Sequence, residues 1–345
     1  MSRKLLSYTA LGLILGNAAI ADVPKVAVDI APVHSLVSRV MEGVGSPKLI
    51  IPAGASPHEY SLRPSEAKSL QDADMVIWMG EDLAPWMENS IEKLAKNAEV
   101  ITLLEASETK LLDFREGALF EEHDHGDHDD HDDHDDHDHD KDHDDHDDHD
   151  DHDHDKDHGD HDDHDDHDDH AGHDHGEHDP HAWLSIENAQ TWLNLVAGKL
   201  SAADPENAGV YFGNAAAARS EIEELSKEVN SILDPVRGRS FVVFHDAYQY
   251  FETSFDFPAS GAISLGDATD PSASRIAEIQ GRVREEGINC VLSEPQYNPN
   301  LVETVLEGTD AKTGVIDPLG VNLEPGSKLY GDLIRNMAKS LAGCL

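Results

Sequence analysis

The sequence predicts an α/β protein with two lobes, each a parallel sheet flanked by helices, joined by one long rigid helix that leaves a cleft between them. Two observations support this fold class. Strand-like and helix-like segments alternate with short connections in both halves of the 345-residue chain, which is the pattern of a parallel α/β sheet. Between the halves, Pro205 is followed by no proline until Pro235. A helix of up to about 29 residues, roughly 43 Å long, fits this stretch and exceeds one small lobe.

Residues 1–21 are expected to be a secretory signal. Two basic residues precede a mostly apolar run from Leu5 to Ile20, which is too short to span a bilayer comfortably. Ala19-Ile20-Ala21 is a small-x-small cleavage site and leaves Asp22 as the mature start. The residue directly after the cut is not a cysteine, so lipid anchoring is not indicated, and no later segment has the composition of a transmembrane stretch. We therefore expect an exported, periplasmic protein without a membrane anchor.

The first lobe is expected over 22–203. Short runs rich in Val and Ile predict strands, and apolar residues at helical spacing predict helices. The strands are expected at 25–30, 48–51, 75–79 and 100–104, and the helices at 32–44, 63–73, 85–96 and 185–201. Pro64 or Ser65 suits the first turn of the second helix, and Ser185 suits the N-cap of the fourth.

A tract of extreme composition, 123–178, interrupts this lobe. It holds 20 His and 29 acidic residues, mostly in a three-residue His-Asp-Asp repeat, and it lacks the apolar surface needed to build a core. We therefore expect a disordered loop. Neutral imidazoles bind zinc, copper and nickel, and carboxylates add negative charge and oxygen ligands. An acidic linker would need Asp alone, so the histidines indicate transition-metal binding.

The linking helix is expected over 204–234 and the second lobe over 235–345. Asp204-Pro205-Glu206 supplies a capping residue, a first-turn proline and a first-turn acid. In the second lobe we expect Asp270-Pro271 to cap a helix in the same way. Strands are expected at 240–244, 262–265, 289–293 and 313–316, and helices at 270–286, 301–307 and 328–341.

Charge and cysteine content narrow the function classes. The formal net charge is −46; the tract contributes −27, which leaves −19 on the rest of the chain. Such a balance argues against nucleic acid and anionic membrane surfaces as partners and favours cations. Cys290 and Cys344 are the only cysteines in the sequence. In an oxidising compartment we expect them to pair, the alternative being two separate buried thiols.

Three histidines lie beside the ends of expected elements. His58 follows the second strand, His245 ends a strand of the second lobe, and His181 precedes the helix that begins at Ser185. Asp317 ends the last strand, and ligands of open α/β sheets sit at the carboxyl ends of strands. Three imidazoles with a carboxylate or water form a four-coordinate set that suits zinc. His34 is assigned to the core or the surface instead.

These residues lie in motifs that resemble the ZnuA family of periplasmic zinc-binding proteins, in the metal-binding cluster of ABC-transporter solute receptors. The likeness covers essentially the whole mature chain, in the family's order, and includes the His/Asp tract and the cysteine pair. The motifs are Pro57-His58-Glu59-Tyr60-Ser61-Leu62-Arg63-Pro64-Ser65, Asp179-Pro180-His181-Ala182-Trp183-Leu184-Ser185, Phe244-His245-Asp246-Ala247-Tyr248, Ser293-Glu294-Pro295-Gln296 and Asp317-Pro318-Leu319-Gly320.

The resemblance implies that His58, His181 and His245 bind Zn²⁺. Histidine at 245 indicates zinc, because manganese-preferring relatives place Glu there and harder oxygen ligands suit manganese. Asp317 matches a carboxylate that some relatives use as the fourth ligand. Other relatives place an acid directly before the first histidine, where this chain has Pro57, and Glu59 is expected to point away. Asp317 and water are the main alternatives for the fourth position, with Glu59 a further one.

The resemblance also implies a mechanism. A receptor of this family captures zinc in the periplasm and delivers it to a zinc ABC permease, which a cytoplasmic ATPase drives. The tract would gather or sense zinc by tethering it near the cleft. We expect a monomer with no nucleic-acid partner.

Two other functions are alternatives to this receptor. An enzyme is disfavoured because His58-Glu59 begins like a zincin motif but position 62 is Leu rather than His, and no Gly-x-Ser-x-Gly elbow is present. A metal storage or chaperone protein, with the folded part as a carrier, is the other alternative. Titration separates a store, which binds many equal ions, from a receptor with one tight site.

Overall fold

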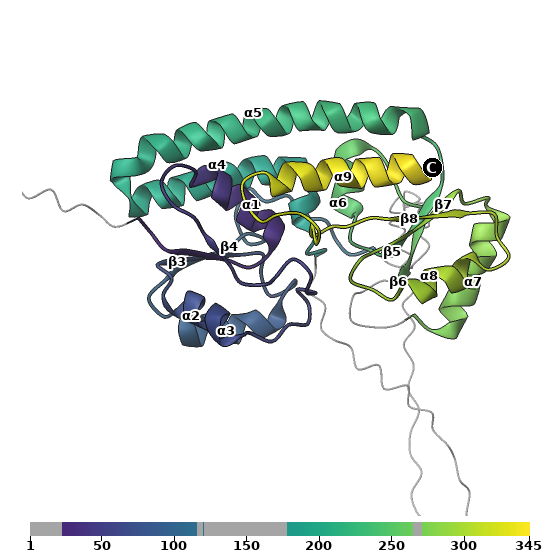
Figure 1. The fold of residues 1–345 in the computed structure, drawn as a ribbon, viewed down its shortest axis with the longest axis horizontal. Coiled ribbons are helices and arrows are strands. Elements are labelled where there is room, and N and C mark those ends of the chain that lie inside the picture. The colour runs from purple at the N-terminus through teal and green to yellow at the C-terminus, as the bar shows by residue number, and fades with distance from the viewer. Residues whose placement is uncertain (1–22, 116–119, 121–177, 265–270) are drawn as a thin grey trace, which may run out of the picture. The chain divides into compact units, whose positions relative to one another are not determined.

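The computed structural model describes residues 23–115, 120, 178–264 and 271–345. Within them the chain forms two four-stranded sheets, each with all of its strand pairs parallel. Helices flank both sheets, and a long helix lies between the two in sequence (Figure 1). The predicted fold class is confirmed. The described residues on both sides of the tract belong to one compact unit, and the proposed domain boundaries remain a prediction.

The first sheet has the strand order β2-β1-β3-β4. Its two central strands are buried along their whole length, as the Val- and Ile-rich runs of a sheet covered on both faces should be. The elements are β1 Val26–Val28, α1 Ala31–Val40, β2 Lys48–Leu49, α2 Pro64–Gln71, β3 Met75–Trp78, α3 Pro85–Leu94 and β4 Glu99–Thr102.

The second sheet repeats this arrangement as β6-β5-β7-β8. In both sheets the first strand in sequence lies beside the second and the third, so the chain reverses its winding direction at the β1/β3 and β5/β7 pairs. Binding sites of open α/β sheets lie outside the carboxyl ends of such pairs. The elements are β5 Phe241–His245, α6 Gln249–Phe255, β6 Gly261–Ser264, α7 Ala273–Glu285, β7 Cys290–Ser293, α8 Pro299–Leu306, β8 Lys312–Val315 and α9 Leu329–Cys344.

Asp29 bridges the carboxyl ends of β1 and β3. One carboxylate oxygen accepts a hydrogen bond from the backbone N–H of Met79 at 2.6 Å, and the other accepts one from Ile30 at 2.7 Å. The side chain is fully buried, and burial raises its pKa to about 7 against these two bonds. This carboxyl group therefore fixes the first switch point of the fold and titrates near neutral pH.

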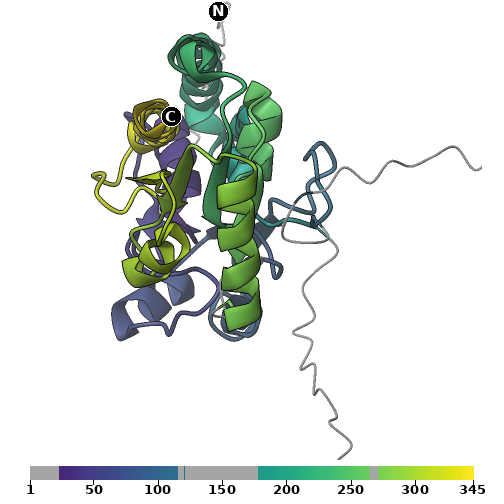
Figure 2. The same cartoon turned by 90° about the vertical axis from the view of Figure 1, so that its right-hand side faces the viewer.

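The long helix α5, Ala208–Leu233, runs across both sheets, with α4, Ile186–Ala203, under one half and α9 under the other (Figures 1 and 2). Its buried residues recur every three or four positions, which gives one apolar face. They are Tyr211, Ala215, Ala218, Ile222, Leu225, Val229 and Leu233. The predicted long helix is confirmed, and its packing on both α4 and α9 makes it a common support for the two sheets.

Some predicted boundaries differ from the structure. The helical segment begins at Pro205 as predicted, but its first turn, Pro205–Asn207, is a 3-10 turn before α5, and the Asp204 side chain accepts hydrogen bonds from the Asn207 and Tyr211 side chains and makes no capping bond. Helix α7 begins at Ala273 with Ser272 as its N-cap, not at the predicted Asp270-Pro271, and Asp270 lies outside the described residues. Helix α6 was not predicted, because a helix of only 7 residues is too short to show a clear amphipathic period.

Three other predictions, two helix starts and one disulfide, were correct. Ser185 accepts a hydrogen bond from the backbone N–H of Asn188 and caps α4, and Pro64 opens α2. Cys290 of β7 and Cys344 at the end of α9 form a disulfide with Cα atoms 5.8 Å apart. Among the described residues no helix is long and apolar enough to cross a bilayer. The predicted signal 1–21 lies outside the described residues, as does the tract except for His178.

Candidate metal centre

His58 reaches the site from the long loop that follows β2. Its neighbour Pro57 is buried, and the Pro57 carbonyl oxygen accepts a hydrogen bond from the Trp86 indole at 2.8 Å, which fixes the loop. The His58 ring is half-buried and lies 5.6 Å from the ring of His181, measured between centroids. Glu59 is exposed. The loop therefore presents the imidazole to the interior and the adjacent carboxylate to solvent.

His181 is oriented by a carboxylate two residues before it. Asp179 Oδ1 accepts hydrogen bonds from the His181 backbone N–H at 2.9 Å and from Nδ1 of its ring at 2.7 Å. Both side chains are almost completely buried. The opposite nitrogen, Nε2, is shielded from solvent and has no hydrogen-bond partner among the described residues. A buried imidazole in this arrangement presents its Nε2 lone pair as a metal ligand.

His245, the last residue of β5, is held in the same way by Glu294, which follows β7. Its Nδ1 donates to Glu294 Oε1 at 2.6 Å, so the bond spans the β5/β7 switch point. Its ring lies 5.3 Å from that of His181 and 5.4 Å from that of Tyr297. Burial raises the pKa of the neighbouring Tyr248 well above its usual value, and the charge of Glu294 adds to this effect.

The three imidazoles line one small cavity of about 10 Å³, together with Trp183, Glu294 and Gln296. Two imidazoles on one tetrahedral zinc have ring centroids about 5 Å apart, because each Zn–N bond is about 2.0–2.1 Å. The two measured separations are close to this value. The described residues nevertheless contain no group of three or more His, Cys, Asp or Glu side chains gathered closely enough to hold a metal ion as they stand. Binding thus requires small movements of these rings.

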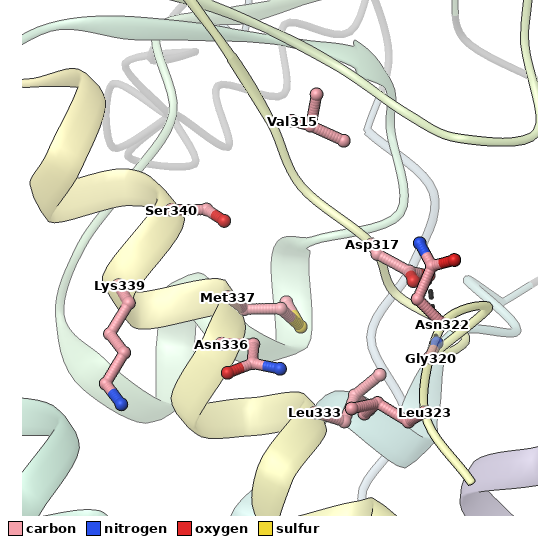
Figure 3. Close-up of a pocket in the computed structure, with 10 residues that line it drawn as sticks. All are labelled: Val315, Asp317, Gly320, Asn322, Leu323, Leu333, Asn336, Met337, Lys339 and Ser340. Carbon is pink, nitrogen blue, oxygen red and sulfur yellow. Dashed lines mark hydrogen bonds between the residues drawn. The ribbon is translucent and has the colours of Figure 1, made fainter.

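Asp317 is not among the residues that line this cavity. Its carboxylate accepts hydrogen bonds from the backbone N–H groups of Leu319, Gly320 and Val321, at 3.0, 2.9 and 2.7 Å. Figure 3 shows it beside Asn322 in a neighbouring cavity that α9 lines. Gly320 has a φ of +75°, and a Cβ there would lie 3.2 Å from Leu323, so this turn requires glycine.

The residues that flank the tract, 112–115 on one side and 178–179 on the other, form a stem. This stem is joined to the second sheet next to His245. Arg115 forms ion pairs with Asp246 and Glu252, two side chains that are nearly inaccessible to solvent. Burial raises the pKa of both carboxyl groups although Arg115 opposes this shift. At the other end of the tract, His178 pairs with Asp113 in an antiparallel bridge, with Nδ1 2.9 Å from Asp113 Oδ1.

The Tyr250 hydroxyl completes this stem. It donates a hydrogen bond to the Asp179 carbonyl oxygen at 2.9 Å and accepts one from the Leu112 backbone N–H, also at 2.9 Å. The two chain segments that enter and leave the tract are therefore tied to each other and to helix α6. His181 lies three residues after the end of the tract.

Sequence reasoning missed the function of Asp179 and Glu294. Both residues stand in the motifs that suggested the site, and a ligating histidine usually donates its second ring N–H to a carboxylate. An acid two residues before His181 was the available signal for Asp179. For Glu294 the signal was tertiary, since 49 positions separate it from His245. His34 lies on α1 with its ring nitrogens near the Pro47 carbonyl oxygen and the Ser38 hydroxyl, as a core histidine does.

Comparison with known proteins identifies relatives over nearly the full length. Residues 26–344 match the family model ZnuA, described as "Zinc-uptake complex component A periplasmic". The chain is 46% identical over 343 residues to the High-affinity zinc uptake system protein ZnuA of Paracoccus denitrificans (strain Pd 1222), with 98% of each chain covered. It is 44% identical over 330 residues to the protein of that name from Brucella abortus (strain 2308), covering 96% of this chain and 94% of the relative.

Solved structures show the same fold at lower identity. One titled "Crystal structure of ZnuA" has a TM-score of 0.68 at 18% identity and covers 94% of this chain and 99% of its own. A Mn-bound periplasmic metal-binding protein from Candidatus Liberibacter asiaticus has a TM-score of 0.64 at 18% identity, covering 92% and 98%. Because a manganese-bound protein shares it, the fold does not by itself select zinc.

Proposed function

We propose, because this chain belongs to the ZnuA family of periplasmic zinc-uptake components, that His58, His181 and His245 together hold one Zn²⁺ ion, which the chain delivers to a membrane permease. Family membership makes the protein a zinc-binding receptor of an ABC uptake system and not an enzyme. The ligand set, the delivery step and the function of the tract are the parts proposed here.

The observation that carries the ligand set is the convergence of three imidazoles at one cavity. His58 lies on the loop after β2 of the first sheet, and His181 lies shortly before α4. His245 is the last residue of β5 in the second sheet. Asp179 and Glu294 hold Nδ1 of His181 and His245, and Nε2 of His181 is buried without a hydrogen-bond partner among the described residues, so it can bind an ion. Neutral imidazoles favour zinc over the harder manganese ion.

Release of the ion is expected to be local. Helix α5 runs across both sheets and packs on α4 and α9, which opposes a wide hinge opening. Two of the three ligands are almost completely buried, whereas His58 is half-buried and lies on a loop. Movement of the His58 loop would reduce the shell to two imidazoles and lower the affinity. This is the step that a permease bound at the mouth of the cavity would favour.

The test replaces each ligand by alanine and measures the affinity for the first equivalent of zinc, by competition with a chelator. Each of His58→Ala, His181→Ala and His245→Ala should weaken it by at least 100-fold. His34→Ala is the matched control, because His34 contacts Pro47 and Ser38 and should leave the affinity unchanged. A triple variant that keeps one tight equivalent would refute this site.

The tract is proposed to raise the local zinc concentration. Its 20 histidines supply many weak sites, and its stem joins the body beside His181 and His245. Deletion of 123–177 keeps His178 and thereby the bridge to Asp113. We expect unchanged affinity at the tight site and slower growth in zinc-poor medium in cells that depend on this protein. Growth equal to that of the full chain would refute the gathering function.

A further inference from the structure

Gln296 is a polar residue of the cavity whose hydrogen bonds the described residues do not supply. It lies on the loop after β7, between Glu294, which binds His245, and Tyr297, which packs on the His245 ring. Its carboxamide oxygen and nitrogen are both shielded from solvent, and neither has a hydrogen-bond partner in the described part of the chain. A buried carboxamide without partners is unfavourable, so a group from outside the chain is expected to satisfy it.

We propose that Gln296 is a positioning residue whose carboxamide oxygen accepts a hydrogen bond from a water molecule in the fourth coordination position of the bound zinc. The inference rests on the proposed function. Three imidazole nitrogens leave one position open on a tetrahedral ion. Water bound to zinc is more acidic than bulk water and is therefore a strong donor. The carboxamide oxygen is a neutral acceptor that lines the same cavity as the three rings.

The contacts of Asp317 favour water over this carboxylate as the fourth ligand. Three backbone N–H groups already hold its two oxygens, and it lines the neighbouring cavity (Figure 3). Moving it onto the ion would break charge-assisted bonds within a turn that Gly320 makes tight. Gln296 needs no such loss, because its two polar atoms have no bond to give up among the described residues.

The size and charge of the cavity agree with a water ligand. A volume of about 10 Å³ is close to that of one water-sized sphere, so a water molecule needs less enlargement of this cavity than a carboxylate or phosphate from solution would. Glu294 already places negative charge beside His245. A neutral carboxamide then holds the bound water without adding a second anionic ligand, which keeps the shell exchangeable, as delivery requires.

The experiment uses the full chain and compares Gln296→Met, which keeps the side-chain length and removes both polar atoms, with Asp317→Asn. In chelator competition with zinc alone, Gln296→Met should bind the first equivalent about 5-fold more weakly, the value of one hydrogen bond. Its metal-free form should be at least as stable as the parent chain, because an unsatisfied buried group is removed. Asp317→Asn should lower the stability of the metal-free form and change the affinity less than 2-fold.

Two further variants complete the design. Gln280→Met is the matched control: this glutamine of α7 bonds the Thr304 and Glu307 carbonyl oxygens, and its loss should not change zinc affinity. His181→Ala reports metal bound outside the cavity. Parent-like affinity in Gln296→Met with a loss of 50-fold or more in Asp317→Asn would overturn the proposal and make Asp317 the ligand. Unchanged affinity in His181→Ala would instead overturn the proposed function.

Discussion

Replacement of Arg115 by methionine should destabilise the protein more than the loss of any exposed ion pair. Arg115 Nη1 lies 2.7 Å from Glu252 Oε2, and its Nε lies about 3 Å from both oxygens of Asp246. The side chains of both acids are 5% exposed and that of Arg115 is 16% exposed. Breaking a buried pair by removing one partner typically costs about 3–5 kcal/mol, because the remaining charge stays buried without a counter-ion.

The assay measures urea unfolding of the metal-free protein, with tryptophan fluorescence as the signal. Arg39→Met is the matched control, since Arg39 pairs with Glu221, whose side chain is 61% exposed. An exposed pair of this kind contributes less than about 1 kcal/mol. The triple variant Arg115→Met/Asp246→Asn/Glu252→Gln removes the buried charges as well and should recover most of the lost stability. A loss in Arg115→Met no larger than that in Arg39→Met would refute the reasoning.

The remaining predictions concern the disulfide, a buried acid and the carboxylate behind His245. Replacing Cys290 and Cys344 by alanine should lower the free energy of unfolding by about 4 kcal/mol for a 54-residue separation in loop-entropy models; a change below about 1 kcal/mol in urea unfolding would contradict this. The pKa of Asp29, about 7 in the folded protein, lies above its unfolded value. This side chain therefore takes up a proton on folding, and stability should fall by about 4 kcal/mol as the pH rises from about 4 to 7. Asp29→Asn should abolish this part of the difference between pH 5 and pH 8 in urea unfolding, and an unchanged difference would exclude Asp29 as its source. Glu294→Gln should weaken zinc binding about 10- to 100-fold in chelator competition, because the partner of a ligating imidazole orients the ring and raises its basicity; parent-like affinity would show that this bond is dispensable.

The parallel sheets were predictable because their strands are short Val- and Ile-rich runs with helices between them. Capping residues also worked where the signal was local, as at Ser185. Local signals failed where tertiary contacts decided the outcome. Asp204 looks like an N-cap in sequence, but its carboxylate bonds Asn207 and Tyr211. Helix α6 lies against the stem of the tract and has only 7 residues, too few for a clear amphipathic period to mark it.

For the candidate site, motif order and strand ends were sufficient to select three histidines that line one cavity. The sequence could not separate Asp317 from water as the fourth ligand, and it gave no reason to compare Asp317 with Gln296. Both follow strands of the second sheet, and their difference lies in hydrogen bonding: three backbone donors for the carboxylate, and no partner within the described residues for the carboxamide. This difference in hydrogen bonding can be seen only in the structure.

The Asp113–His178 bridge has a consequence for how this gene can change. The bridge joins the two ends of the tract at the stem. The folded part of the protein therefore does not depend on how many residues lie between these two ends. Doubling the length of such an insertion adds only about 0.6 kcal/mol of closure entropy. The fold would therefore tolerate the gain or loss of single His-Asp-Asp repeats. Among descendants of this protein, the number of histidines should therefore drift or be selected independently of the binding cavity.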